Sequence, residues 1–136
     1  MLKFVKSELL TLPVVMNIEE FREFCLNKHQ VTEEFPFGPE TLVFKVAGKI
    51  FALTGLDNST FTVNLKCDPT YAEELRENFP EVRPGYHMNK KHWNTVQFDG
   101  ALPENLLVEL INHSYELVVN SLPLSTRKKL GFLMGS

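Results

Sequence analysis

Two kinds of apolar periodicity run along this chain, and they predict where helices and strands lie. Phe21 and Cys25 follow Asn17 in the chain and fall on one helical face. Asn17 and Glu20 form a capping-box pattern. A first helix is therefore predicted over residues 17–28. Further helices are predicted from the same spacing over residues 69–79, 103–121 and 126–130.

Segments in which polar and apolar residues alternate predict the strands. They cover residues 41–46, 50–56, 61–66 and 93–98, with a short extended piece at 82–83 beside the last. The connections between the first three are too short for a parallel crossover, so these strands should form an antiparallel meander. The proline-rich run at 35–39 is predicted to be a loop or an edge segment, and Pro84–Gly85 a type II turn.

The predicted element order is α-βββ-α-ββ-α, which indicates a two-layer α+β domain. One antiparallel sheet should pack its helices on one face and leave the other partly open to water. Thr62, Asn64 and Lys66 alternate with apolar neighbours, as an open face requires. We expect residues 1–15 to be an N-terminal extension, 16–131 a single domain and 132–136 a C-terminal tail.

Composition agrees with one ordinary globular domain. The chain has 136 residues, 43% hydrophobic and 23% charged, and a length of this order supports a core without a disulfide or metal. Cys25 and Cys67 lie far apart without a C-x-x-C pattern, which favours two reduced thiols and a cytoplasmic protein. Lys6 and Glu8 interrupt the first apolar run, so no export signal is expected. No apolar stretch approaches the length of a membrane span, so no membrane partner is expected either.

Catalytic and metal-binding patterns are weak. The chain has no G-x-S-x-G motif and no glycine-rich phosphate loop, and the spacing of His87 and His92 does not suit zinc. Cys67 stands between Lys66 and the helix cap Asp68, which could lower its pKa, but a structural thiol is the more common case. We therefore expect no enzyme, no catalytic residue, no metal site and no cofactor.

The densest chemistry lies in residues 83–93, where cations and aromatic rings are interleaved, a pattern that suits nucleic acid. The candidate nucleic-acid-binding residues are Lys66, Arg83, Tyr86, His87, Asn89, Lys90, Lys91 and His92. The alternative is a solvated loop whose Tyr86 and Trp93 pack into the edge of the core, as rings beside a turn often do. The run at 127–129 could extend the same basic surface or complement the end of its own helix. The net charge of −3 counts against a protein that coats nucleic acid indiscriminately.

Several segments resemble the MmcQ/YjbR family of small bacterial proteins. The most diagnostic is PGYHMNKKHWNTV at 84–96, and the others lie at 31–38, 42–46, 64–69 and 113–118. The resemblance covers about residues 16–130 and implies a fold like that of frataxin and of secretion chaperones. Members of the family are commonly labelled DNA-binding, and they have no agreed catalytic residues.

Three functional hypotheses follow. The first is a non-enzymatic domain whose partner is DNA, held through the basic-aromatic segment. The second is a protein- or peptide-binding or chaperone-like module that uses the open sheet face or the groove beside residues 35–37. The third is a small-molecule or enzyme site at residues 86–89 and Cys67, which requires these groups to converge on one cavity. Oligomeric state is left open.

Overall fold

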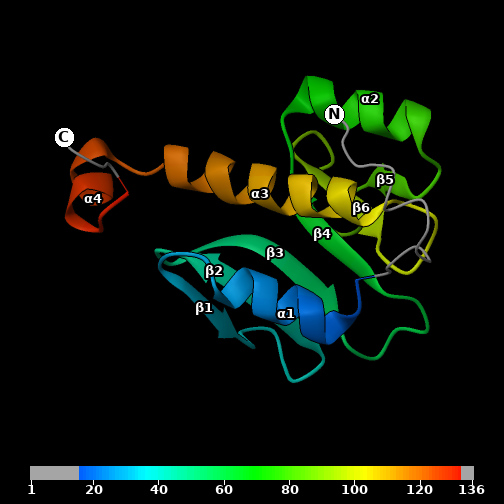
Figure 1. The fold of residues 1–136 in the computed structure, drawn as a ribbon, viewed down its shortest axis with the longest axis horizontal. Coiled ribbons are helices and arrows are strands. Elements are labelled where there is room, and N and C mark those ends of the chain that lie inside the picture. The colour runs from blue at the N-terminus through cyan, green and yellow to red at the C-terminus, as the bar shows by residue number, and fades with distance from the viewer. Residues whose placement is uncertain (1–15, 133–136) are drawn as a thin grey trace, which may run out of the picture.

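The fold is a six-stranded antiparallel sheet with helices on one face (Figure 1). A computed structural model describes residues 16–132. The strands are β1 (Val31–Glu34), β2 (Thr41–Val46), β3 (Lys49–Gly55), β4 (Thr62–Lys66), β5 (Val82–Pro84) and β6 (Trp93–Gln97). The helices are α1 (Ile18–Leu26), α2 (Pro69–Asn78), α3 (Glu104–Asn120) and α4 (Leu124–Lys129). The strand order is β1-β2-β3-β4-β6-β5, which confirms the predicted α+β class.

Local sequence determines where the helices begin. The Asn17 side chain accepts from the Glu20 N–H at 2.8 Å, and Glu20 accepts in return from the Asn17 N–H, so the predicted capping box is present. Asp68 caps α2 by accepting from the Tyr71 N–H at 3.1 Å, with Pro69 at the first helical position. The meander of β2, β3 and β4 and the pairing of β5 with β6 are confirmed as well.

The core lies between the sheet and the helices. Phe21 of α1 packs edge-to-face against Phe44 and Phe98, with ring centroids 5.3 and 5.5 Å apart, and all three side chains are buried. Helix α3 crosses the middle of the sheet (Figure 1). Its buried Ser114 hydroxyl donates to the Phe51 carbonyl at 2.5 Å and accepts from the Lys66 N–H at 2.9 Å. One side chain thus joins α3 to both β3 and β4.

The sheet opens between β3 and β4. These two strands pair over Ala52↔Leu65 and Leu53↔Asn64, whereas β4 and β6 pair over five residues. Beyond Leu53 the Thr54 hydroxyl donates to the Thr62 carbonyl at 2.6 Å, which holds the separating strands at a fixed distance. The open face is therefore hollowed along this line.

Two local predictions were wrong. Strand β1 was not predicted; it is an edge strand that pairs with β2 over four residues. No type II turn forms at Pro84–Gly85, because Pro84 ends β5 and the left-handed residue is His87, with φ 60°. The turn is instead closed by the Met88 N–H and the Gly85 carbonyl at 3.2 Å. The first helix ends at Leu26 with Asn27 as its C-cap, which agrees with the predicted end near residues 27–28.

The basic residues of α4 lie away from the segment 83–93. Arg127, Lys128 and Lys129 occupy the last turn of α4, which lies at the opposite end of α3 from β5 and β6 (Figure 1). They do not extend the surface of residues 83–93, and they complement the carboxyl end of their own helix. Within residues 16–132, no helix combines the length and apolarity that a bilayer crossing requires.

Candidate binding cleft on the open face of the sheet

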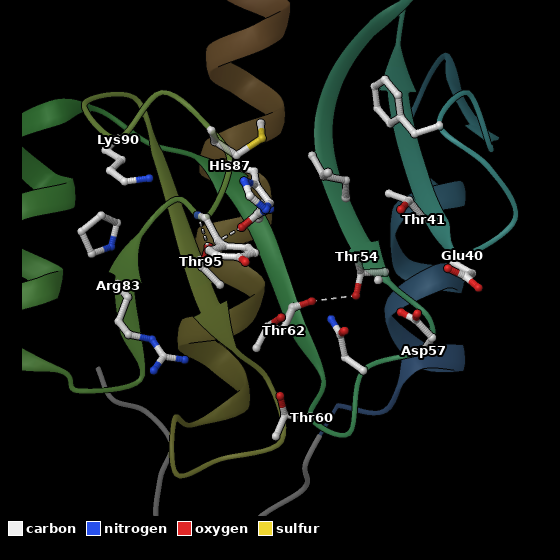
Figure 2. A pocket seen from close by; sticks show the side chains of 18 residues that line it. Glu40, Thr41, Thr54, Asp57, Thr60, Thr62, Arg83, His87, Lys90 and Thr95 are labelled. Atoms are coloured by element: carbon white, nitrogen blue, oxygen red, sulfur yellow. Dashed lines mark hydrogen bonds between the residues drawn. The ribbon is translucent and has the colours of Figure 1, made fainter.

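A cleft of about 920 Å³ follows the line where β3 and β4 separate. Its floor is formed by the open-face residues Leu53, Thr62, Asn64 and Thr95. One side, which we call the cationic wall, consists of Arg83, Tyr86, His87, Met88 and Lys90. The other side, the acidic wall, consists of Phe37, Glu40, Thr41, Asp57 and Asn58. Figure 2 shows Arg83 and Lys90 on one side and Glu40 and Asp57 on the other.

Hydrogen bonds attach the cationic wall to the floor. The Thr95 hydroxyl accepts from the Tyr86 N–H at 2.9 Å and donates to the Asn64 side-chain oxygen (Figure 2). Because the Asn64 oxygen is engaged by Thr95, its amide nitrogen remains the group that can donate to a ligand on the floor. The floor thus holds the turn after β5 in place and supplies polar groups of its own.

The turn that carries the cationic wall is tightly packed. The Gly85 N–H donates to the Trp93 carbonyl at 2.9 Å, and a Cβ at Gly85 would lie 2.8 Å from Cβ of Trp93. The Lys90 ammonium donates to the Gly85 carbonyl at 2.8 Å, and Arg76 of α2 donates to the Lys90 carbonyl. These contacts give the segment a defined shape, so its side chains are presented in a fixed arrangement.

The cationic wall combines unpaired charge with exposed rings. The two ion pairs within residues 16–132 are Arg22–Glu33 and Lys45–Glu34, so Arg83 and Lys90 are not neutralised by a carboxylate there. Tyr86 is 68% exposed, and its ring lies against His87 with centroids 4.0 Å apart. An exposed ring pair beside two cations can accept both a flat ligand group and an anion.

The acidic wall is built by the β2–β3 hairpin. The Leu56 N–H donates to the Glu40 carbonyl at 2.8 Å, which extends the ladder beyond the Thr41↔Gly55 pair. Glu40 precedes β2 and Asp57 follows β3, so the hairpin brings both carboxylates to the same end. Phe37, which is 66% exposed, lies on the same wall. Glu40 and Asp57 were not among the candidate residues, although the predicted hairpin of residues 41–46 and 50–56 implies that they are neighbours.

Half of the candidate residues line the cleft. These are Arg83, Tyr86, His87 and Lys90. The other four do not line it: Lys66, Asn89, Lys91 and His92. Asn89 accepts from the Lys91 N–H at 2.9 Å, and the His92 carbonyl accepts from the Cys67 N–H at 2.8 Å. Asn89 and His92 therefore shape the segment that carries the cationic wall.

The small-molecule site that combined His87 with Cys67 is contradicted. Cys67 is buried in the core on the helix side of the sheet, whereas His87 lines the cleft on the opposite face. Burial raises the pKa of both thiols, Cys25 and Cys67, to about 12, so both remain protonated at neutral pH. The part of the chain that the structure describes contains no group of three or more His, Cys, Asp or Glu side chains able to hold a metal ion.

This chain is similar to proteins of one family. The model of the YjbR family matches residues 26–117. The uncharacterised protein YbdF of Escherichia coli O157:H7 is 44% identical over 96 residues, covering 71% of this chain and 79% of YbdF. The uncharacterised protein YjbR of Escherichia coli K12 is 36% identical over 115 residues, covering 85% of this chain and 98% of YjbR.

Solved structures agree with the sheet and helices described above. The crystal structure of Deinococcus radiodurans protein DR2400 has a TM-score of 0.83 and 42% identity, and the match covers 88% of this chain and 92% of that one. A crystal structure from Pseudomonas syringae has a TM-score of 0.65 and 29% identity, covering 75% of this chain and 98% of that one. A likeness to frataxin or to secretion chaperones stays a prediction.

Proposed function

This chain belongs to the YjbR family, and for this member we propose a non-enzymatic domain that binds single-stranded nucleic acid in the cleft. The observation that carries the proposal is the cationic wall. Arg83 and Lys90 stand there without a carboxylate partner among the described residues, beside the exposed Tyr86 and His87 rings. Phosphates bind to such cations, and unpaired bases stack on exposed rings.

The opposite charge of the two walls favours a single strand over a duplex. A duplex presents phosphates on both of its edges, so one backbone would face the carboxylates of Glu40 and Asp57. A single strand presents phosphates along one edge and base edges along the other. Its polarity therefore matches a cleft with cations on one side and acceptors on the other.

The salt dependence of binding tests the role of Arg83 and Lys90. Each phosphate contact on a single strand contributes about −0.7 to the slope of log K against log salt, so two contacts predict about −1.4. Fluorescence anisotropy with a labelled single strand should give this slope. R83A should reduce its magnitude by about 0.7. K90Q should act similarly while keeping a donor for the Gly85 carbonyl.

Two control variants make the measurement specific to the cleft. Lys129 lies on α4 at the other end of the molecule, so K129A should leave both affinity and slope unchanged. Lys91 is exposed next to Lys90 but does not line the cleft, so K91A should have little effect. No binding at micromolar protein, or a slope unaffected by R83A and K90Q, would contradict the proposal.

Peptide binding is the second candidate, and a separate observation favours it. Phe35, Phe37 and Leu56 are exposed to 49%, 66% and 44%, and Phe37 opens onto the cleft. Exposed apolar side chains at the rim of a groove are typical of protein-binding surfaces. If peptides carrying one Phe and one Arg bind in the cleft, F37S should abolish their binding. If single-stranded nucleic acid then fails to displace such a peptide from the cleft, the result would count against the first candidate.

A further inference from the structure

The acidic wall offers hydrogen-bond acceptors, and the proposed function leaves open which base they prefer. Phosphates and stacking need only the cationic wall, yet Glu40 and Asp57 face the same cleft. Both are exposed, and neither takes part in the ion pairs formed within residues 16–132. We propose that this wall recognises an unpaired guanine base, with Asp57 and Glu40 as acceptors for its base edge. The inference rests on the proposed function, because the base must belong to a strand held by the cationic wall.

The hydrogen-bond pattern of a carboxylate selects guanine among the bases. An ionised carboxylate accepts at both oxygens and donates at neither. Guanine presents two adjacent donors on its pairing edge, N1–H and the N2 amino group, and can therefore satisfy both oxygens at once. Adenine and cytosine each place an acceptor beside their amino donor, and thymine places carbonyls on both sides of its N3–H. These acceptors would repel the carboxylate.

The walls also place the base and the phosphate on the correct sides. A phosphate at Arg83 and Lys90 directs the attached base across the floor toward Asp57 and Glu40 (Figure 2). The exposed Phe37 ring on the acidic wall offers a stacking surface for that base. The backbone that carries these acids is held by the Leu56–Glu40 hydrogen bond at the end of the β2–β3 ladder. The acceptors are thus on a fixed hairpin end.

Single strands that differ at one base test the inference. Labelled thymidine oligomers of about eight nucleotides would carry guanine, adenine, cytosine or thymine at a central position. The strand with guanine should bind about fivefold or more tightly than the others, since a bidentate contact discriminates to this extent. Inosine, which lacks the N2 amino group, should lose most of the advantage. D57N and E40Q together should reduce the guanine strand to the affinity of the thymidine strand.

Further variants separate a failure of this inference from a failure of the proposed function. E73Q/E77Q removes two negative charges, as D57N/E40Q does, from exposed positions on α2 outside the cleft, and it should preserve the guanine preference. If all strands bind equally, with a salt slope that R83A reduces, the guanine inference is overturned while the proposed function stands. A guanine preference that persists in the D57N/E40Q variant also overturns it. If no strand binds, both fail.

Discussion

Gly85 lies where the backbone of the cationic wall passes closest to β6. A side chain there would meet Cβ of Trp93 at 2.8 Å and Cβ of Met88 at 3.0 Å, and neither atom belongs to the flexible end of its side chain. The backbone of Gly85 also has to remain in place, because its N–H donates to the Trp93 carbonyl. The residue is thus required by close approach and not by an unusual φ.

We expect G85A to lower the free energy of unfolding by about 1–3 kcal/mol, because overpacking forces the backbone to shift. Urea unfolding followed by tryptophan fluorescence would measure the change, since Trp93 lies in direct contact. The matched control is G100A. The three atoms nearest to a Cβ at Gly100 belong to the Gln97 and Glu81 side chains at 3.3 Å, and these side chains can move aside. Equal losses in the two variants would contradict the argument from close approach.

At the scale of elements, a side chain of α3 forms direct hydrogen bonds to the backbone of the sheet. Ser114 joins α3 to the Phe51 carbonyl of β3 through a buried hydrogen bond and to the Lys66 N–H of β4 through a partly buried one. S114A would remove the partner of the buried Phe51 carbonyl and of the partly buried Lys66 N–H, at a cost of about 1–3 kcal/mol. Chemical denaturation should show this loss. S121A, which removes a hydroxyl bonded within the helix, should cost less, and a reversed order would contradict the bridging role.

Most elements could be predicted from local patterns, because caps and apolar spacing act within a few residues. Asn17, Asp68 and Pro103 mark helix starts that the structure places within one residue. Strand β1 could not be predicted, since three of its four residues are polar and its stability comes from pairing with β2 and from the Arg22–Glu33 ion pair. Such partners lie outside any local window of sequence.

The same limit explains the outcome for the cleft. The sequence indicated the cationic wall, since its residues are contiguous in the chain. The acidic wall joins residues from two ends of a hairpin, and the hollow itself depends on the short β3–β4 pairing. Periodicity predicts that β3 and β4 exist and pair, but it does not predict where their pairing stops. The residues of the floor and of the cationic wall could therefore be predicted from the sequence, whereas the cleft that they line could not.

For the whole molecule, the opposed walls predict a preference between nucleic-acid forms. A single strand should bind more tightly than a duplex of the same sequence, because a second backbone would face Glu40 and Asp57. Competition between labelled single strands and unlabelled duplex would measure the ratio. In the D57N/E40Q variant the ratio of single-strand to duplex affinity should fall, because the carboxylates that repel the second backbone are removed. A duplex that competes as well as the single strand would argue against a cleft-bound ligand.

The brief pairing of β3 with β4 has an evolutionary consequence. Residues 56–60 connect the two strands on the surface, and they are exposed throughout. Insertions or deletions there would alter the rim around Asp57 without disturbing the packed layer beneath α3. A lineage of such proteins could in this way change what it recognises, one connection at a time, on a scaffold that stays the same.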